Sequence, residues 1–162
     1  MNLDLKNLII SMCSLMSVSG HESTSEKALT ELIGKYFDEY KTDAVGNYLF
    51  IKKSAKENAP SLLIDTHFDE IGMFVTDIKE GGFLSVTSVG GLDPAIMQAS
   101  EVRIYGKETL TGIIASTPPH LRANTSEKKL KNIDELLIDT GYPKEELEEI
   151  VRIGTPVGFA PV

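Results

Sequence analysis

The first forty residues place hydrophobic side chains with the period of an α-helix. Apolar residues recur at this spacing from Leu5 to Met16 and predict a helix over residues 3–16. A second helix is predicted to begin near Ser23, because Ser23 and Glu26 fit the spacing of a capping box. Its buried stripe is expected to consist of Ala28, Leu29, Leu32, Ile33, Tyr36 and Phe37.

The hydrophobic period changes from helical to strand-like after residue 40. Residues 40–45 and 48–53 flank a Gly46-Asn47 pair, which predicts a β-hairpin because both residues tolerate positive φ. After a polar loop, residues 61–66 contain the run Leu62-Leu63-Ile64, which is typical of a strand covered on both faces. Two helices, a hairpin and a buried strand together indicate an α/β layer.

The segment after His67 reads as all-β. Residues 71–78, 83–89, 101–105 and 111–115 are predicted to be strands, several of them separated by glycine pairs. Such short spacing favours a small barrel or sandwich over βαβ units.

The last third of the chain begins with a polar loop. It runs from Pro118-Pro119 to about Asn132, and it is followed by a predicted strand over residues 136–138. Residues 143–150 are predicted to form a short helix, with proline in its first turn. A further strand is expected within the apolar stretch 154–162.

Composition and charge narrow the class of protein. With 162 residues, 41% of them hydrophobic, the chain is long enough to bury a sizeable core. Its net charge of −8 disfavours nucleic-acid binding, which typically needs an excess of positive charge. A single cysteine allows no internal disulfide and points to a cytoplasmic protein. A signal peptide over residues 8–16 is disfavoured, because Asp4 spoils the basic region that should precede it.

Candidate chemistry concentrates directly after the predicted buried strand, in Thr66-His67-Phe68-Asp69-Glu70. Ligands collect at the carboxyl ends of strands in α/β sheets. In an extended chain, His67 and Asp69 point to the same side, so the carboxylate can orient the imidazole or bind a metal itself. Glu70 then faces the other way, and a glycosidase pair of Asp69 and Glu70 is disfavoured.

A structural histidine–carboxylate contact explains the same residues equally well. A catalytic metal site needs three or more protein ligands. The remaining histidines are His21, in a Gly-His-Glu turn, and His120, which follows Pro-Pro. Both are expected to be solvated loop residues, so the residue types alone leave the metal and the structural interpretations open.

An ordered set of short motifs resembles the N-terminal part of one peptidase family. The motifs are Ser19-Gly-His-Glu22, Asp43-Ala-Val-Gly-Asn47, Thr66-His-Phe-Asp-Glu-Ile-Gly72, Gly90-Gly-Leu-Asp93, Gly112-Ile-Ile-Ala115, Pro119-His120 and Ile138-Asp-Thr-Gly141. They resemble the cellulase-M-like, glutamyl aminopeptidase family of dinuclear metallopeptidases, which includes the tetrahedral aminopeptidases. The likeness covers essentially the whole chain.

The resemblance implies a phosphorylase/peptidase-like α/β catalytic domain that is interrupted by an inserted β-barrel-like dimerisation domain. It places residues 1–72 in the catalytic domain, residues 73–154 in the insert, and residues 155–162 at the start of the return into the catalytic domain. It also implies two divalent metal ions, zinc or cobalt, in the complete enzyme. His67 matches a metal ligand, and Asp69 matches the catalytic carboxylate that orients the metal site.

The family's bridging aspartate, catalytic glutamate and remaining ligands have no counterpart among the motifs of this chain. The resemblance therefore leads us to expect a truncated or split aminopeptidase that is inactive alone and acts on peptides when a missing C-terminal half completes it. A non-catalytic dimerisation or assembly module is the alternative. Either form is expected to be a homo-oligomer, associating through unpaired strand edges or through the insert.

Overall fold

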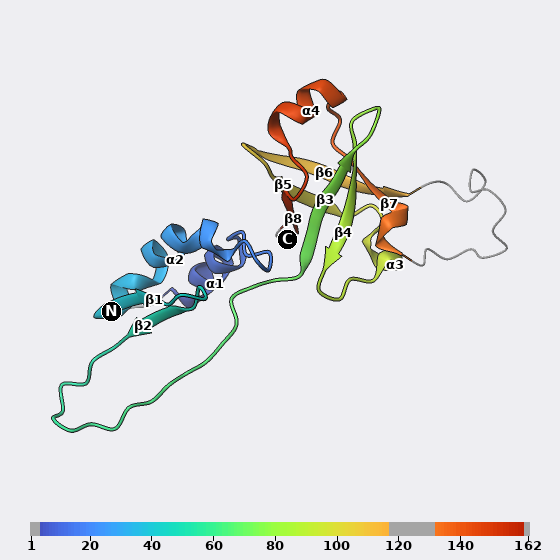
Figure 1. Cartoon of the computed structure of the whole chain (residues 1–162). Helices are drawn as coiled ribbons and strands as arrows, with labels where there is room; N and C mark the ends of the chain where they lie inside the picture. Colours follow the sequence, from blue (N-terminus) through green and yellow to red (C-terminus); the bar gives the residue numbers. More distant parts are fainter. Residues whose placement is uncertain (1–3, 117–131, 161–162) are drawn as a thin grey trace. The chain divides into compact units, whose positions relative to one another are not determined.

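The computed structural model describes residues 4–116 and 132–160, and it divides into two compact units, Met1–Asp69 and Glu70–Val162 (Figure 1). The first unit holds short helices and a hairpin, and the second holds a β-barrel. The mixture of α/β and all-β parts agrees with the sequence prediction. None of the helices in the described ranges has the length and apolar run that a membrane span requires.

The first helix, α1, is shorter than predicted and spans Leu5–Cys13. Asp4 caps it by accepting a hydrogen bond from the amide of Asn7 at 3.1 Å. The expected end at Met16 is wrong. The amide of Ser14 bonds to the carbonyl of Ser11, three residues back, and its hydroxyl bonds to the carbonyl of Ile10 at 2.8 Å. These bonds tighten the last turn and end the helix.

The second helical segment starts differently from the predicted capping box. A 3₁₀ turn, η1, covers Glu22–Ser25, the helix α2 covers Glu26–Ile33, and a second 3₁₀ turn, η2, covers Gly34–Tyr36. The predicted box of Ser23 and Glu26 does not form, because the Glu26 carboxylate instead accepts a hydrogen bond from the Tyr40 hydroxyl at 2.8 Å. This bond ties α2 to the hairpin.

The predicted hairpin is confirmed as strands β1, Glu39–Thr42, and β2, Tyr48–Ile51, which pair antiparallel. Its turn is closed by Asp43. The Asp43 carboxylate accepts from the amide of Asn47 at 2.9 Å and from the side-chain amide of Asn47 at 2.7 Å. Gly46 takes a φ of +92°, a conformation that glycine adopts without steric cost.

The strand expected over residues 61–66 is not formed. Leu62, Leu63 and Ile64 are 86%, 78% and 81% exposed, and the segment carries no strand assignment. An extended segment becomes a strand only by exchanging hydrogen bonds with a neighbour, and the described residues offer it none. The apolar run is therefore exposed on both sides.

The second unit is a closed antiparallel barrel with the strand order β3-β4-β7-β6-β5-β8. This outcome confirms the predicted small barrel and its strands. The strands are β3 Gly72–Ile78, β4 Phe83–Val89, β5 Glu101–Tyr105, β6 Thr109–Ser116, β7 Leu136–Asp139 and β8 Pro156–Phe159. β8 pairs with β3 on one side and with β5 on the other, so residues 156–159, expected at a return into the α/β part, close the barrel.

Alternating residues of every barrel strand fill one continuous core. Short helices at opposite ends of the barrel add to it: α3, Pro94–Met97, contributes Met97, and α4, Lys144–Ile150, contributes Leu147 (Figure 1). A 3₁₀ turn, η4, at Ile133–Glu135 leads into β7. The largest fully buried side chains of the barrel include Met73, Leu84, Ile104, Ile114, Leu136 and Ile138.

The β3–β4 turn requires glycine at one position more strictly than at its neighbour. Gly81 and Gly82 both have positive φ, at +80° and +77°. A Cβ on Gly82 would collide with the carbonyl oxygen of Tyr142, whereas one on Gly81 would lie 3.3 Å from the movable ring of Phe83. The turn therefore depends on a close backbone approach at Gly82.

We expect Gly82→Ala to lower the free energy of unfolding of the barrel by about 2–4 kcal/mol. The matched variant Gly81→Ala should cost only the left-handed backbone penalty of roughly 1–2 kcal/mol. Urea denaturation followed by circular dichroism measures both values. Equal losses for the two variants would contradict the proposed collision.

The Asp43 turn yields a prediction about pH. The side-chain and backbone hydrogen bonds from Asn47 hold the pKa of the Asp43 carboxyl below its ordinary value. Ionised Asp43 therefore stabilises the turn above its ordinary pKa, and this contribution is lost as the pH falls through the lowered pKa of the folded state. Asn47→Ala should raise the pKa in an NMR titration of the Asp43 carboxyl carbon. Val45→Ala, which keeps its backbone donor to Asp43, should leave the pKa unchanged, and a shift there would count against the assignment.

Candidate functional site

The His67-Phe68-Asp69 segment ends the first unit and lies outside any helix or strand. The two polar side chains meet, as their two-residue spacing predicts. Nδ1 of His67 lies 2.9 Å from the backbone oxygen of Asp69 and 3.4 Å from its Oδ1. The imidazole remains 85% exposed and the Asp69 side chain 43% exposed. The pair is therefore preformed and open to solvent.

The partner of Nδ1 fixes the tautomer of the imidazole. A backbone carbonyl can only accept a hydrogen bond, so Nδ1 of His67 carries the proton and donates it to Asp69. The Nε2 lone pair is then free and lies on an exposed ring. This is the arrangement in which a histidine acts as a metal ligand while a second group orients it.

Glu70 takes no part in this pair and belongs to the barrel unit. Its Oε1 lies 3.6 Å from the position of a Cβ built on Gly158, beside the ring of Tyr105. Burial raises the pKa of the Tyr105 hydroxyl, and the negative charge of Glu70 raises it further while Arg103 opposes the shift. Glu70 is thus engaged with β5 and β8.

The residues that the structure describes do not assemble all the ligands of a metal site. In ranges 4–116 and 132–160, no group of three or more His, Cys, Asp or Glu side chains could hold a metal ion. His67 supplies one ring nitrogen, with the backbone oxygen of Asp69 on its other nitrogen and the Asp69 carboxylate beside it, whereas catalytic zinc sites use three protein ligands. The described residues fit a part of such a site and do not complete it. His120 lies outside the described residues.

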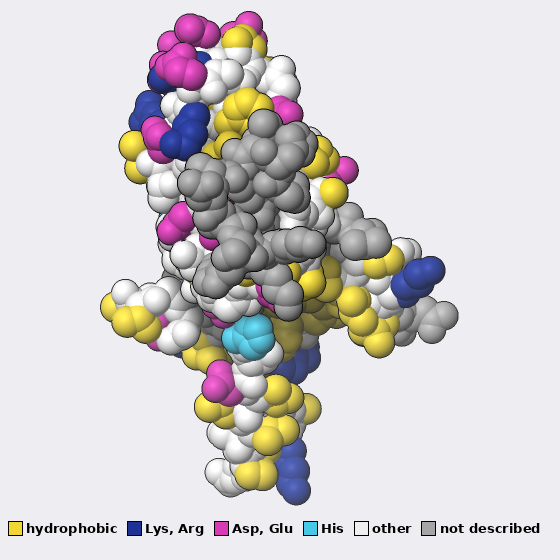
Figure 2. Space-filling model, turned by 90° about the vertical axis from the view of Figure 1, so that its right-hand side faces the viewer, with side chains coloured by type: hydrophobic (Ala, Val, Ile, Leu, Met, Phe, Trp, Pro, Cys, Tyr) yellow, Lys and Arg dark blue, Asp and Glu magenta, His cyan; other side chains and the backbone are white. Residues whose placement is uncertain are grey.

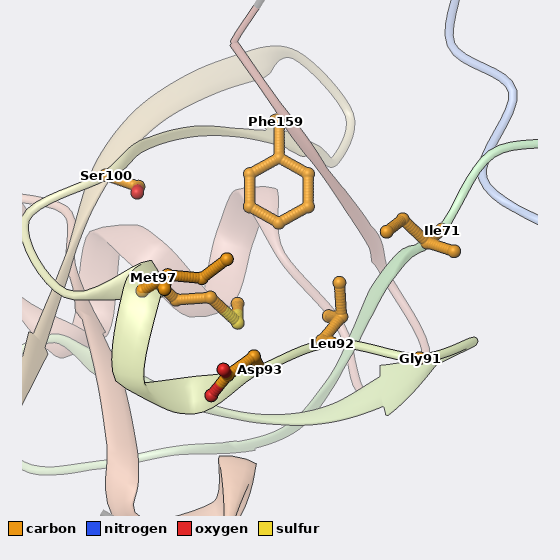
Figure 3. Close-up of a pocket in the computed structure, with 8 residues that line it drawn as sticks. Ile71, Gly91, Leu92, Asp93, Met97, Ser100 and Phe159 are labelled. Atoms are coloured by element: carbon orange, nitrogen blue, oxygen red, sulfur yellow. The ribbon is translucent and has the colours of Figure 1, made fainter.

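An apolar cavity of about 290 Å³ lies within the barrel unit, next to α3. Figure 3 shows Phe159, Met97 and Leu92 around the hollow, with Ile71 at its edge. Asp93 also lines it, but its Oδ1 caps α3 by accepting from the amide of Ala95 at 2.9 Å. Sequence reasoning missed this helix, although Asp93 followed by Pro94 is a typical helix start. The lining of the cavity is mostly apolar and provides few polar groups that could bind or activate a substrate.

Acidic side chains collect on the last helix of the barrel unit. The helix α4 carries Glu145, Glu146, Glu148 and Glu149, and acidic side chains gather around it at the top of Figure 2. Lys144 pairs there with Glu80 at 2.6 Å. These are solvated surface ion pairs that contribute little to stability.

Comparison with known proteins connects the His67–Asp69 pair to one family of enzymes. The sequence model of the M42 glutamyl aminopeptidase family matches residues 46–162. A lysyl aminopeptidase from Pyrococcus furiosus is 34% identical over 149 residues, covering 89% of this chain and 42% of that protein. The chain thus spans about two fifths of the length of this relative.

Solved structures show the same likeness. A TET aminopeptidase from Thaumarchaeota archaeon SCGC AB-539-E09 superposes with a TM-score of 0.83 at 30% identity, covering 95% of this chain and 43% of that chain. The Pyrococcus horikoshii TET1 peptidase, described as able to assemble into a tetrahedron or a large octahedral shell, gives a TM-score of 0.77 at 30% identity, with coverages of 96% and 46%. The family match covers most of the sequence, including the His67–Asp69 pair, and the chain therefore belongs to the M42 glutamyl aminopeptidase family.

Proposed function

We propose that this chain contributes His67 and Asp69 to the active site of a metal-dependent aminopeptidase that removes N-terminal residues from peptides. The observation that carries the proposal is the contact between the two residues, with Nδ1 of His67 held by Asp69 and Nε2 free on an exposed ring. Membership of the family supports the reaction class. The disulfide-free composition supports a cytoplasmic location.

The roles of the two residues follow from their chemistry. Two divalent ions, zinc or cobalt, would supply a nucleophilic water and polarise the scissile carbonyl. In this assignment Nε2 of His67 is a ligand to one ion. The backbone oxygen of Asp69 accepts a hydrogen bond from Nδ1–H, which orients the ring and increases the basicity of Nε2. The other ligands and the general base would come from outside the described residues, which assemble no third ligand.

The proposed domain arrangement is an α/β catalytic domain with the barrel inserted into it. The division of the chain between Asp69 and Glu70 supports an insert that starts directly after the His67–Asp69 pair. Pairing of β8 with β3 and β5 supports an insert that includes residues 156–159.

A non-catalytic assembly module is the second candidate, and one observation favours it. The barrel has a closed strand order and its own buried core, so it can persist without a finished catalytic domain. Stable dimers of the chain that bind no metal would support this function. Binding of zinc through His67 would support the first.

The first function predicts weak zinc binding and no turnover by the 162-residue chain. With Zn²⁺ or Co²⁺ added, lysyl and glutamyl p-nitroanilides should remain uncleaved, since in this assignment the described residues supply no general base. His67→Ala should lower the affinity for Zn²⁺, measured by competition with a chromogenic chelator, at least tenfold. His120→Ala removes another imidazole of the chain, one to which this assignment gives no role, and should leave the affinity unchanged. Hydrolysis by the chain alone, or equal zinc affinities for all variants, would refute this assignment.

We also propose that the chain forms homo-oligomers. Leu62, Leu63 and Ile64 expose apolar surface on an unpaired extended segment. Such a segment favours pairing with another chain. The barrel surface is the alternative site of association.

Light scattering after size exclusion should therefore give a mass that rises with concentration. Leu63→Asp should shift the protein towards the monomer, because it places a charge in the middle of the apolar run. Ile153→Asp adds the same charge at an isolated side chain that is 75% exposed, and it should have no effect. Unchanged association in Leu63→Asp would assign the contact to the barrel, and a monomer at high concentration would rule out self-association.

A further inference from the structure

The His67–Asp69 pair needs a support that its own backbone does not provide. Residues 52–69 contain no helix or strand, so ladder hydrogen bonds do not fix the orientation of the pair. A metal ligand must nevertheless be held within a fraction of an ångström for binding to be tight. A contact from a side chain of the segment 52–69 is therefore needed to restrain it.

Phe68, between the two polar residues, makes such a contact. Its ring meets the ring of Tyr48 edge-on, with centroids 6.0 Å apart and planes at 69°. This is a favoured geometry for an aromatic pair. Both residues are half-buried, as is Asp69, whereas His67 is exposed. Phe68 thus joins the irregular segment to the strand β2.

The hairpin that presents Tyr48 is itself well restrained. Tyr48 directly follows Asn47, which is bound to Asp43 through both its backbone and its side chain. The Tyr48 ring lies 6.3 Å from the ring of Tyr40, and Tyr40 is hydrogen-bonded to Glu26 of α2. Phe68 therefore contacts a ring that is linked both to the turn and to a helix.

The contact between Phe68 and Tyr48 also determines the direction of the His67 and Asp69 side chains. In an extended chain, successive side chains point to opposite sides, so holding Phe68 towards β2 turns His67 and Asp69 away from it together. The separation of 3.4 Å between Nδ1 of His67 and Oδ1 of Asp69 agrees with this common direction of the two side chains. Without the aromatic contact, rotation of the segment would separate the imidazole from its partner.

We propose that Tyr48 and Phe68 are positioning residues that hold His67 in the Nδ1–H tautomer with Nε2 free for a metal ion. The inference rests on the proposed function for the role of His67 as a metal ligand, but the tautomer of His67 can be measured without catalysis. It assigns to β2 and the Asp43–Asn47 turn the role of aligning the metal-binding pair.

The test uses the full 162-residue chain labelled with ¹⁵N-histidine in alkaline buffer. Long-range ¹H–¹⁵N spectra report which nitrogen of His67 carries the proton. We expect the Nδ1–H form to predominate in the wild type and to fall to the level of an unstructured peptide in Phe68→Ala and Tyr48→Ala. Zinc affinity should fall about tenfold in both variants, in the range for loss of a group that orients a ligand.

Two variants separate positioning from general stability. Tyr48→Phe keeps the ring and should retain both the tautomer and the zinc affinity. Phe37→Ala removes a ring whose centroid lies 5.3 Å from that of Phe50 in the same unit and which is not a member of the pair of Tyr48 and Phe68. It should lower stability without changing the His67 spectrum.

The outcomes distinguish the two proposals. An unchanged His67 tautomer in Phe68→Ala, or an equal change in Phe37→Ala, overturns the positioning role. If Phe68→Ala changes the tautomer while His67→Ala leaves zinc binding intact, the positioning role stands and the metal-binding function fails. Should Phe68→Ala lose the fold of the first unit, Phe68→Leu, which keeps apolar volume but no ring edge, must still shift the tautomer for the inference to hold.

Discussion

The requirement that every extended backbone find hydrogen-bonding partners governs this structure. In the barrel unit each strand has two neighbours, because the order β3-β4-β7-β6-β5-β8 closes on itself. In the first unit, as far as the structure describes it, β1 and β2 pair in a two-stranded sheet, and the apolar run Leu62–Ile64 stays exposed. One unit is thus complete in its pairing, whereas the other holds a segment with the composition of a buried strand and no strand beside it.

Local sequence signals identified the elements whose partners lie nearby. The strands around Gly81-Gly82 and the hairpin around Gly46 were predictable, because turn chemistry fixes which segments meet. The prediction of a strand at Leu62–Ile64 is wrong. An apolar run indicates that a segment favours burial, but it does not identify the neighbouring strands that would bury it. Likewise, the capping box predicted for Ser23 and Glu26 does not form, because Glu26 accepts a hydrogen bond from the Tyr40 hydroxyl instead. Tyr40 is distant in the sequence, so no local pattern reveals this bond.

The candidate site was predictable to a similar extent. Spacing placed His67 beside Asp69, and the structure brings the two together at 2.9 Å. The tautomer was not predictable, because it depends on a backbone oxygen rather than on a residue type. The ring contact between Phe68 and Tyr48 was also missed, although an aromatic residue between two polar ones is a signal that it faces the opposite way. Its partner in β2 could be identified only from the fold.

Barrel closure has a consequence for the order of events during synthesis. Met73 at the start of the barrel pairs with Val157 near its end, so the ladder between β3 and β8 joins residues that are far apart in the sequence. Contacts of such high sequence separation form late, because the entropy of closing the long loop must be met first. On a translating ribosome, the hairpin of the first unit can therefore form well before the barrel, which waits until β8 has left the exit tunnel.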